Sequence, residues 1–157
     1  HSFPTRRSSD LDICIASTDA KFATSEVRLG LAPSTISPYV IRAIGARQAS
    51  RYFLTAERIS AHEAKQIGLA HEIADAEDLD KKVQEIIDAL LLGGPHAQAA
   101  SKQLIQMVSN QSMNDELLRQ TAQHIAQVRQ GSEAKEGLTA FLNKQAPAWT
   151  SNSNNNN

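Results

Sequence analysis

Residues 22–33 are the part of the sequence whose residue types best suit acid/base catalysis. A single carboxylate, Glu26, follows strand-forming residues in this stretch. Three apolar side chains come soon after it: Val27, Leu29 and Leu31. Burial beside apolar groups raises the pKa of a carboxyl group, which would suit Glu26 to proton transfer near neutral pH. The alternative is a structural role, in which Glu26 pairs with Arg28 or caps a turn.

The other groups with catalytic or metal-binding chemistry form no familiar pattern. His62-Glu63 and His71-Glu72 lie nine positions apart, whereas the zinc-binding H-E-x-x-H helix needs two histidines four apart. The single cysteine, Cys14, lies in a predicted buried strand and is interpreted as a core residue. No G-x-S-x-G, Walker or G-x-G-x-x-G motif is present in the sequence. We therefore expect no metal site and no redox cofactor.

Short extended segments are expected on the N-terminal side of Glu26, and helices after it. Residues 12–16 are predicted to form a buried strand, residues 22–24 an extended segment, and residues 69–73 a brief strand or link. The first helix is expected to begin at Ser37 as N-cap with Pro38 at its first position, and to end at Gly45. A second helix follows over residues 48–55. Residues 60–63 form an S-x-x-E capping box that opens a short helix ending at Gly68.

The remainder of the chain predicts four helices with apolar stripes. They are expected over residues 78–92, over residues 95–109, from Ser112 through Val128, and over residues 132–142. A pair of strands is marginally stable without further partners. We therefore interpret the strand part as the edge of a larger sheet whose other strands lie upstream.

Composition and the two ends of the chain limit the class of protein. Hydrophobic residues make up 41% of the sequence, enough for a packed core, and the net charge of -1 does not favour nucleic acid or a membrane surface. No apolar run is long enough to span a bilayer. The lone cysteine fits a reducing, cytoplasmic compartment. Residues 1–11 resemble the translation of a sequencing adapter and are interpreted as a non-native leader, and the polar residues 150–157 as a disordered tail.

An ordered set of short motifs extends over residues 12–149. The motifs are Asp12-Ile13, Phe22, Ser25-Glu26-Val27, Leu29-Gly30-Leu31, Pro33, Arg42-Ala43-Ile44-Gly45, Thr55-Ala56-Glu57-Arg58-Ile59, Glu63-Ala64, Ile67-Gly68-Leu69-Ala70, Glu136-Gly137, Ala140-Phe141-Leu142, Lys144, and Pro147 to Trp149. In this order they resemble the crotonase (enoyl-CoA hydratase/isomerase) superfamily. The resemblance implies an α/β fold, with the C-terminal part of a spiral ββα core over residues 12–76 and a mainly helical C-terminal region over residues 77–149. It also implies a homo-oligomer, a trimer or a dimer of trimers.

The resemblance assigns roles to individual residues. Glu26 matches one of two carboxylates that hydratases of the family use, and it would act as general acid/base. The second carboxylate would fall about twenty residues earlier, where Arg6 stands, and the oxyanion hole lies in the N-terminal half. We therefore expect a fragment that is inactive alone. CoA enters as part of the substrate, and Lys144 is expected to reach its phosphates from an adjacent subunit, unless it is a solvated lysine in the last turn of a helix.

The finer resemblance is to methylglutaconyl-CoA and isohexenylglutaconyl-CoA hydratases. Residues 34–40, Ser-Thr-Ile-Ser-Pro-Tyr-Val, replace the glycine-rich turn of many family members. This change disfavours a straight-chain substrate and makes Ser34 and Thr35 candidates to hydrogen-bond a water. The expected function is that of a lyase that adds water to an α,β-unsaturated acyl-CoA. The alternatives are an enoyl-CoA isomerase or acyl-CoA hydrolase of the same superfamily, or a non-catalytic helical interaction module.

Overall fold

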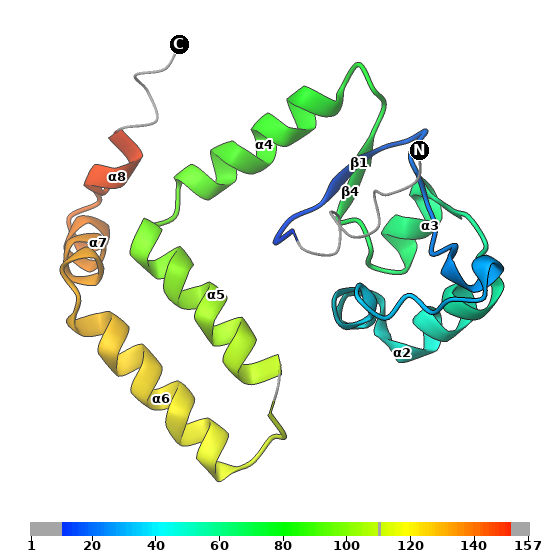
Figure 1. The fold of residues 1–157 in the computed structure, drawn as a ribbon. Coiled ribbons are helices and arrows are strands. Elements are labelled where there is room, and N and C mark those ends of the chain that lie inside the picture. The colour runs from blue at the N-terminus through cyan, green and yellow to red at the C-terminus, as the bar shows by residue number, and fades with distance from the viewer. Residues whose placement is uncertain (1–10, 110, 152–157) are drawn as a thin grey trace. The chain divides into compact units, whose positions relative to one another are not determined.

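A computed structural model describes residues 11–109 and 111–151 of the chain. Its elements are β1 (Ile15–Ser17), β2 (Lys21–Phe22), η1 (Glu26–Leu29), α2 (Ser37–Thr55), β3 (Ile59–Ser60), α3 (Ala61–Gln66), β4 (Glu72–Ala74), α4 (Leu79–Leu91), α5 (Pro95–Ser109), α6 (Asp115–Gln130), α7 (Ser132–Leu142) and α8 (Ala148–Ser151) (Figure 1). The chain divides into two compact units, and the boundary falls between Gln84 and Glu85, inside α4.

The strands of the first unit pair with partners far away in the sequence. β1 lies parallel to β4 (Figure 1), and in this pair Ile15 is opposite Glu72. β2 lies antiparallel to β3, with Phe22 opposite Ile59. Strands were predicted in both halves of the β1–β4 pair, but their bounds are shifted toward the C-terminus. Only the last two residues of the predicted strand over 12–16 belong to β1, because hydrogen bonding to β4 determines where the strand begins.

α2 contains the break that the sequence predicts. Gly45 has φ 76° and ψ 159°, a conformation that glycine adopts readily and that interrupts the helix. The prediction of two helices on either side of Gly45 is therefore confirmed. The predicted N-cap is wrong by one residue, because Ile36 occupies that position. The Ser37 hydroxyl instead donates to the carbonyl oxygen of Ser34 at 2.9 Å.

The core of the first unit lies among α2, α3 and the four strands. Its buried residues form one cluster: Cys14, Ala16, Phe22, Val40, Ile44, Ala49, Tyr52, Ile59, Ala64, Leu69 and Ala70. The interpretation of Cys14 as a core residue is confirmed, and burial raises the pKa of its thiol. The capping box is formed in one direction, since the N–H of Glu63 donates to the Ser60 hydroxyl at 3.2 Å.

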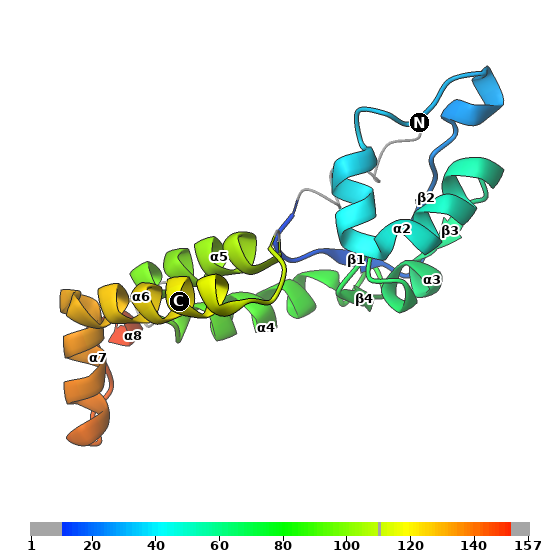
Figure 2. The same ribbon diagram turned by 90° about the horizontal axis from the view of Figure 1, so that it is seen from below.

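The second unit contains the helices that were predicted, and one more. α5 and α6 lie side by side, and α7 runs at a steep angle to them (Figure 2). α6 begins later than predicted because its N-cap is Asn114, whose side chain accepts from the N–H of Leu117 at 2.8 Å. α8 was not predicted. Residues 150 and 151 were expected in the disordered tail, but they are helical.

The remaining expectations for the two ends concern residues 1–10 and 152–157, which lie outside the described residues. Across residues 11–109 and 111–151, no helix combines the length and the apolar character needed to cross a membrane.

Candidate functional site

The sequence suggested that Glu26 ends a buried strand. In the structure, Glu26 is instead the first residue of the 3₁₀ turn η1. The N–H of Leu31 donates to the Glu26 carbonyl oxygen at 3.0 Å, and the N–H of Arg28 donates to the Ser25 carbonyl at 3.1 Å. Gly30 closes the turn in the left-handed region, with φ 73°. These bonds fix the backbone on which the carboxylate is carried.

The Glu26 side chain is half-buried, and one of its two carboxylate oxygens is fully shielded from solvent. This atom, Oε2, has no hydrogen-bond partner within the described part of the chain. A buried polar atom without a partner is costly, so a bound ligand or a water is the usual partner of such an atom. The predicted apolar enclosure is wrong, however, since Val27, Leu29 and Leu31 are 39%, 74% and 62% exposed.

The side chains that flank Glu26 both bind the C-terminal end of α2. The Thr24 hydroxyl donates to the Tyr52 carbonyl oxygen at 3.0 Å, and Arg28 Nη2 donates to the Ala56 carbonyl oxygen at 3.1 Å. No ion pair between Arg28 and Glu26 is present among the described residues. Sequence analysis did not identify either contact, because each joins residues 28 positions apart and no local pattern indicates it.

Ser34 and Thr35 lie in the turn that precedes α2, and both are exposed. The N–H of Ser34 donates to the Ala32 carbonyl oxygen at 2.8 Å. In the region that the structure describes, neither hydroxyl makes a hydrogen bond, and none joins either residue to Glu26. The two hydroxyls are therefore available to a water or a substrate.

Lys144 belongs to the second unit. It lies two residues beyond the end of α7 and not in its last turn, and its backbone has φ 54°. Its N–H donates to the Phe141 carbonyl oxygen at 3.1 Å, and the residue is exposed. Arg6, which stands where a second carboxylate was expected, lies outside the described residues.

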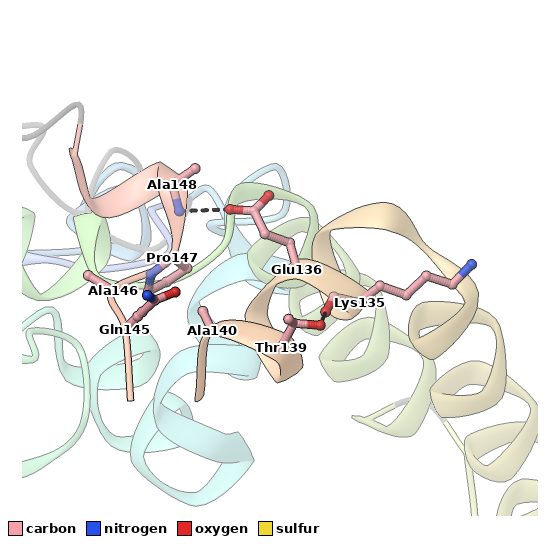
Figure 3. Close-up of a pocket in the computed structure, with 8 residues that line it drawn as sticks. All are labelled: Lys135, Glu136, Thr139, Ala140, Gln145, Ala146, Pro147 and Ala148. Atoms are coloured by element: carbon pink, nitrogen blue, oxygen red, sulfur yellow. Dashed lines mark hydrogen bonds between the residues drawn. The ribbon is translucent and has the colours of Figure 1, made fainter. Parts of the chain in front are cut away.

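Two of the hollows among the described residues lie in the second unit, and none of the predicted site residues lines these two. One, of about 470 Å³, lies between α7 and the segment leading into α8 (Figure 3). There Glu136 Oε1 accepts from the N–H of Ala148 at 2.7 Å, and the Lys135 ammonium points away from the hollow (Figure 3). The other, of about 610 Å³, is lined by α5, α6, α7 and Trp149. The described residues contain no group of three His, Cys, Asp or Glu that could hold a metal ion.

Comparison with known proteins gives consistent matches. The sequence signature described as enoyl-CoA hydratase/isomerase matches residues 9–152. An enoyl-CoA hydratase of Alternaria alternata is 34% identical over 132 residues, which cover 83% of this chain and 44% of that protein. A trans-2-decenoyl-(acyl-carrier-protein) isomerase of Streptococcus mutans is 28% identical over 142 residues, 88% of this chain and 54% of that protein.

Solved structures match the fold as well. The crystal structure of an enoyl-CoA hydratase from Shewanella pealeana superposes with a TM-score of 0.86 at 44% sequence identity. The match covers 90% of this chain and 53% of that one. The chain thus spans about half the length of the proteins that it matches.

Proposed function

The chain belongs to the enoyl-CoA hydratase/isomerase family, and we propose that it forms part of an enzyme that adds water to an α,β-unsaturated acyl-CoA. The observation that carries this proposal is the buried Oε2 of Glu26, which has no partner in the described residues. It belongs to a carboxylate that stands, by resemblance, at a position where hydratases of the family carry an acid/base group.

The proposed reaction needs one proton transfer at each end of the double bond. The oxygen of water bonds to the β carbon while the π electrons move toward the α carbon and the thioester carbonyl. A proton then bonds to the α carbon, so that water is added across the double bond with no change in redox state. Glu26 accepts the proton of the attacking water or supplies the one that reaches the α carbon. CoA is carried by the substrate and is not a separate cofactor.

Three further residues complete the proposal. The unpaired hydroxyl groups of Ser34 and Thr35 hydrogen-bond the water or a polar group on the acyl chain, which favours a methylglutaconyl-like substrate over a straight chain. The Lys144 ammonium contacts a CoA phosphate. If so, Lys144→Ala weakens CoA binding at low salt and has a smaller effect at high salt, because exposed charges are screened. Equal CoA affinity at both salt concentrations would remove Lys144 from the site.

The test of the central role is Glu26→Gln in the whole protein that carries this chain. Glutamine keeps the size of the side chain, but its amide cannot act as a general acid or base. We expect kcat to fall by about 10²- to 10⁴-fold, the usual contribution of a general acid/base. The KM for the enoyl-CoA should remain, since it does not depend on that proton. Glu77→Gln, at an exposed carboxylate of the same unit, is the matched control. Near-normal turnover of Glu26→Gln would return Glu26 to a structural role.

An enoyl isomerase is the second candidate, and the Streptococcus mutans relative favours it. An isomerase moves a proton along the acyl chain and adds no oxygen to the substrate. Turnover in ¹⁸O-labelled water separates the two functions. A hydratase places the label on the β carbon, whereas an isomerase releases product without it.

A further inference from the structure

The short segment that carries Glu26 is hydrogen-bonded on both sides of Glu26 to backbone carbonyl groups near the C-terminal end of α2. Thr24, two residues before Glu26, is 3% exposed and binds the Tyr52 carbonyl oxygen. Arg28, two residues after it, binds the Ala56 carbonyl oxygen. Tyr52 lies in the last turn of α2, and Ala56 is the C-cap residue that follows the helix.

The anchor at the end of α2 is itself rigidly held. Ala56 has φ 51°, a left-handed conformation that is uncommon for a residue other than glycine, and its N–H donates to the Tyr52 carbonyl oxygen at 3.0 Å. The Tyr52 side chain is buried, and its hydroxyl donates to Glu63 Oε1 at 2.7 Å. This hydrogen bond joins α2 to α3.

We propose that Thr24 and Arg28 are positioning residues that hold the Glu26 carboxylate in place for proton transfer. This inference rests on the proposed function and deepens it. Neither side chain is hydrogen-bonded to the carboxylate, so neither takes part in the chemistry directly. Each fixes the backbone two residues away from Glu26, and loss of either bond lets the turn shift while the carboxylate keeps its chemical identity.

The expected kinetic effect follows from geometry. Proton transfer requires the carboxylate within hydrogen-bond reach of the reacting atom, and a displacement of about 1 Å from remote changes costs up to about 10²-fold in rate. Binding of the CoA portion does not depend on that placement. Loss of either anchor should therefore lower kcat by about 10-fold to 100-fold and leave KM within about twofold.

The experiment compares five variants of the whole protein in steady-state kinetics with an enoyl-CoA. Arg28→Met and Thr24→Val remove the two donors. Arg28→Lys and Thr24→Ser keep a donor and should restore most of kcat. Arg47→Met, an exposed arginine on α2, is the matched control and should behave as the unchanged protein. The conservative pair keeps the test decisive if either non-donor variant fails to fold. If neither Lys nor Ser at these positions recovers more activity than Met or Val, the positioning role is overturned.

A double variant separates positioning from general damage. On the Glu26→Gln background no carboxylate is left to position, so adding Arg28→Met should cost less than twofold in kcat. An equal fractional loss on both backgrounds identifies a purely structural effect and overturns the proposal.

The two proposals fail in different ways. If Glu26→Gln collapses turnover while Arg28→Met and Thr24→Val stay within twofold, the positioning role is wrong and the function of Glu26 stands. If Glu26→Gln itself turns over normally, the proposed acid/base role of Glu26 fails, and the positioning role with it.

Discussion

The two units of the chain use helices in different ways. The first buries its apolar side chains in one cluster that α2, α3 and the strands share. In the second, Leu117 is the only apolar side chain among the described residues that is fully buried. Its helices nevertheless carry stripes as regular as any in the first unit. An amphipathic stripe thus indicates that a face favours burial, but it does not show that the chain buries that face by itself.

In the second unit, hydrogen bonds from side chains to helix ends link one helix to another. The Glu133 carboxylate accepts from the N–H groups of His96 and Ala97 at 3.0 and 2.8 Å, so a side chain of α7 caps the start of α5. The indole N–H of Trp149 donates to the Leu92 carbonyl oxygen at 3.2 Å. Helix N-termini carry unsatisfied N–H groups, and an acidic side chain there is stabilising.

The largest expected difference between the units comes from truncating one aliphatic side chain in each. Ile59 is 2% exposed in the first unit, and Ile59→Ala should lower its unfolding free energy by about 2–5 kcal/mol, because it leaves a cavity. Leu118 is 55% exposed in the second, and Leu118→Ala should change stability by less than about 0.5 kcal/mol. Hydrogen exchange resolved by residue measures each unit separately. Equal losses would remove the distinction.

The second expected effect concerns a polar link inside the first unit. The Cys14 N–H donates to Nδ1 of His71 at 3.0 Å, and the His71 N–H donates back to the Cys14 carbonyl oxygen at 2.8 Å. His71→Leu removes the first bond and should cost about 1–3 kcal/mol, because a partly buried donor loses its acceptor. His71→Asn offers an amide oxygen near the same place and should recover part of the loss. Urea unfolding measures both, and a stability of His71→Leu equal to that of the unchanged protein would show that the bond contributes nothing.

A smaller effect is expected at Glu133 in the second unit, and it depends on pH. Desolvation raises the pKa of the Glu133 carboxyl, but the N–H groups of His96 and Ala97 and the nearby His96 ring outweigh it, so the pKa lies below its ordinary value of 4.5. Because the pKa is lower in the folded state, the ionised carboxylate contributes its full stabilisation of α5 above pH 4.5. This stabilisation is lost as the pH falls through the lower pKa of the folded state.

Glu133→Gln should therefore lower the melting temperature of the second unit at pH 7 and flatten its dependence on pH below 4.5. Glu77→Gln, outside that unit, is the control. A steep acid transition that survives in Glu133→Gln would assign the pH dependence to another carboxylate.

The smallest expected effect is at Gly137. A Cβ there would lie 2.8 Å from Cη2 of Trp149, so the indole must move in Gly137→Ala. The better helix propensity of alanine, up to about 1 kcal/mol, offsets the strain of that shift, and we expect little net change in stability. Trp149 is the single tryptophan of the chain, so intrinsic fluorescence reports on this contact directly. An unchanged emission spectrum would show that the two residues do not touch.

The helices and the α/β crotonase-like class were predictable because their signals are local or ordered along the chain. Pro95, the Ser60 capping box and the Gly45 break each act within a few residues, and the structure confirms them. That the chain corresponds to the C-terminal part of the family fold stays a prediction. α6 was expected from Ser112, but Asn114 is its N-cap because its side chain accepts from the N–H of Leu117, a bond that composition does not indicate.

The surroundings of Glu26 were not predictable in the same way. The strand-like residues before it suggested that the strand continued, whereas the hydrogen bonds that Leu31 and Arg28 donate turn the chain at that point. The apolar neighbours face solvent because a 3₁₀ turn does not alternate its side chains as a strand does. The assignment of Glu26 as a catalytic residue came from the family resemblance and remains a proposal.

The interruption at Gly45 has a consequence for the unfolded chain. It divides α2 into two segments, each shorter than the roughly 12–15 residues at which isolated helices become marginally stable in water. α6 runs from Asp115 to Gln130 without such a break and begins with a bonded cap. Under denaturing conditions we therefore expect transient helix to persist in α6 and to vanish from α2, so that refolding of α2 must wait for the core that surrounds it.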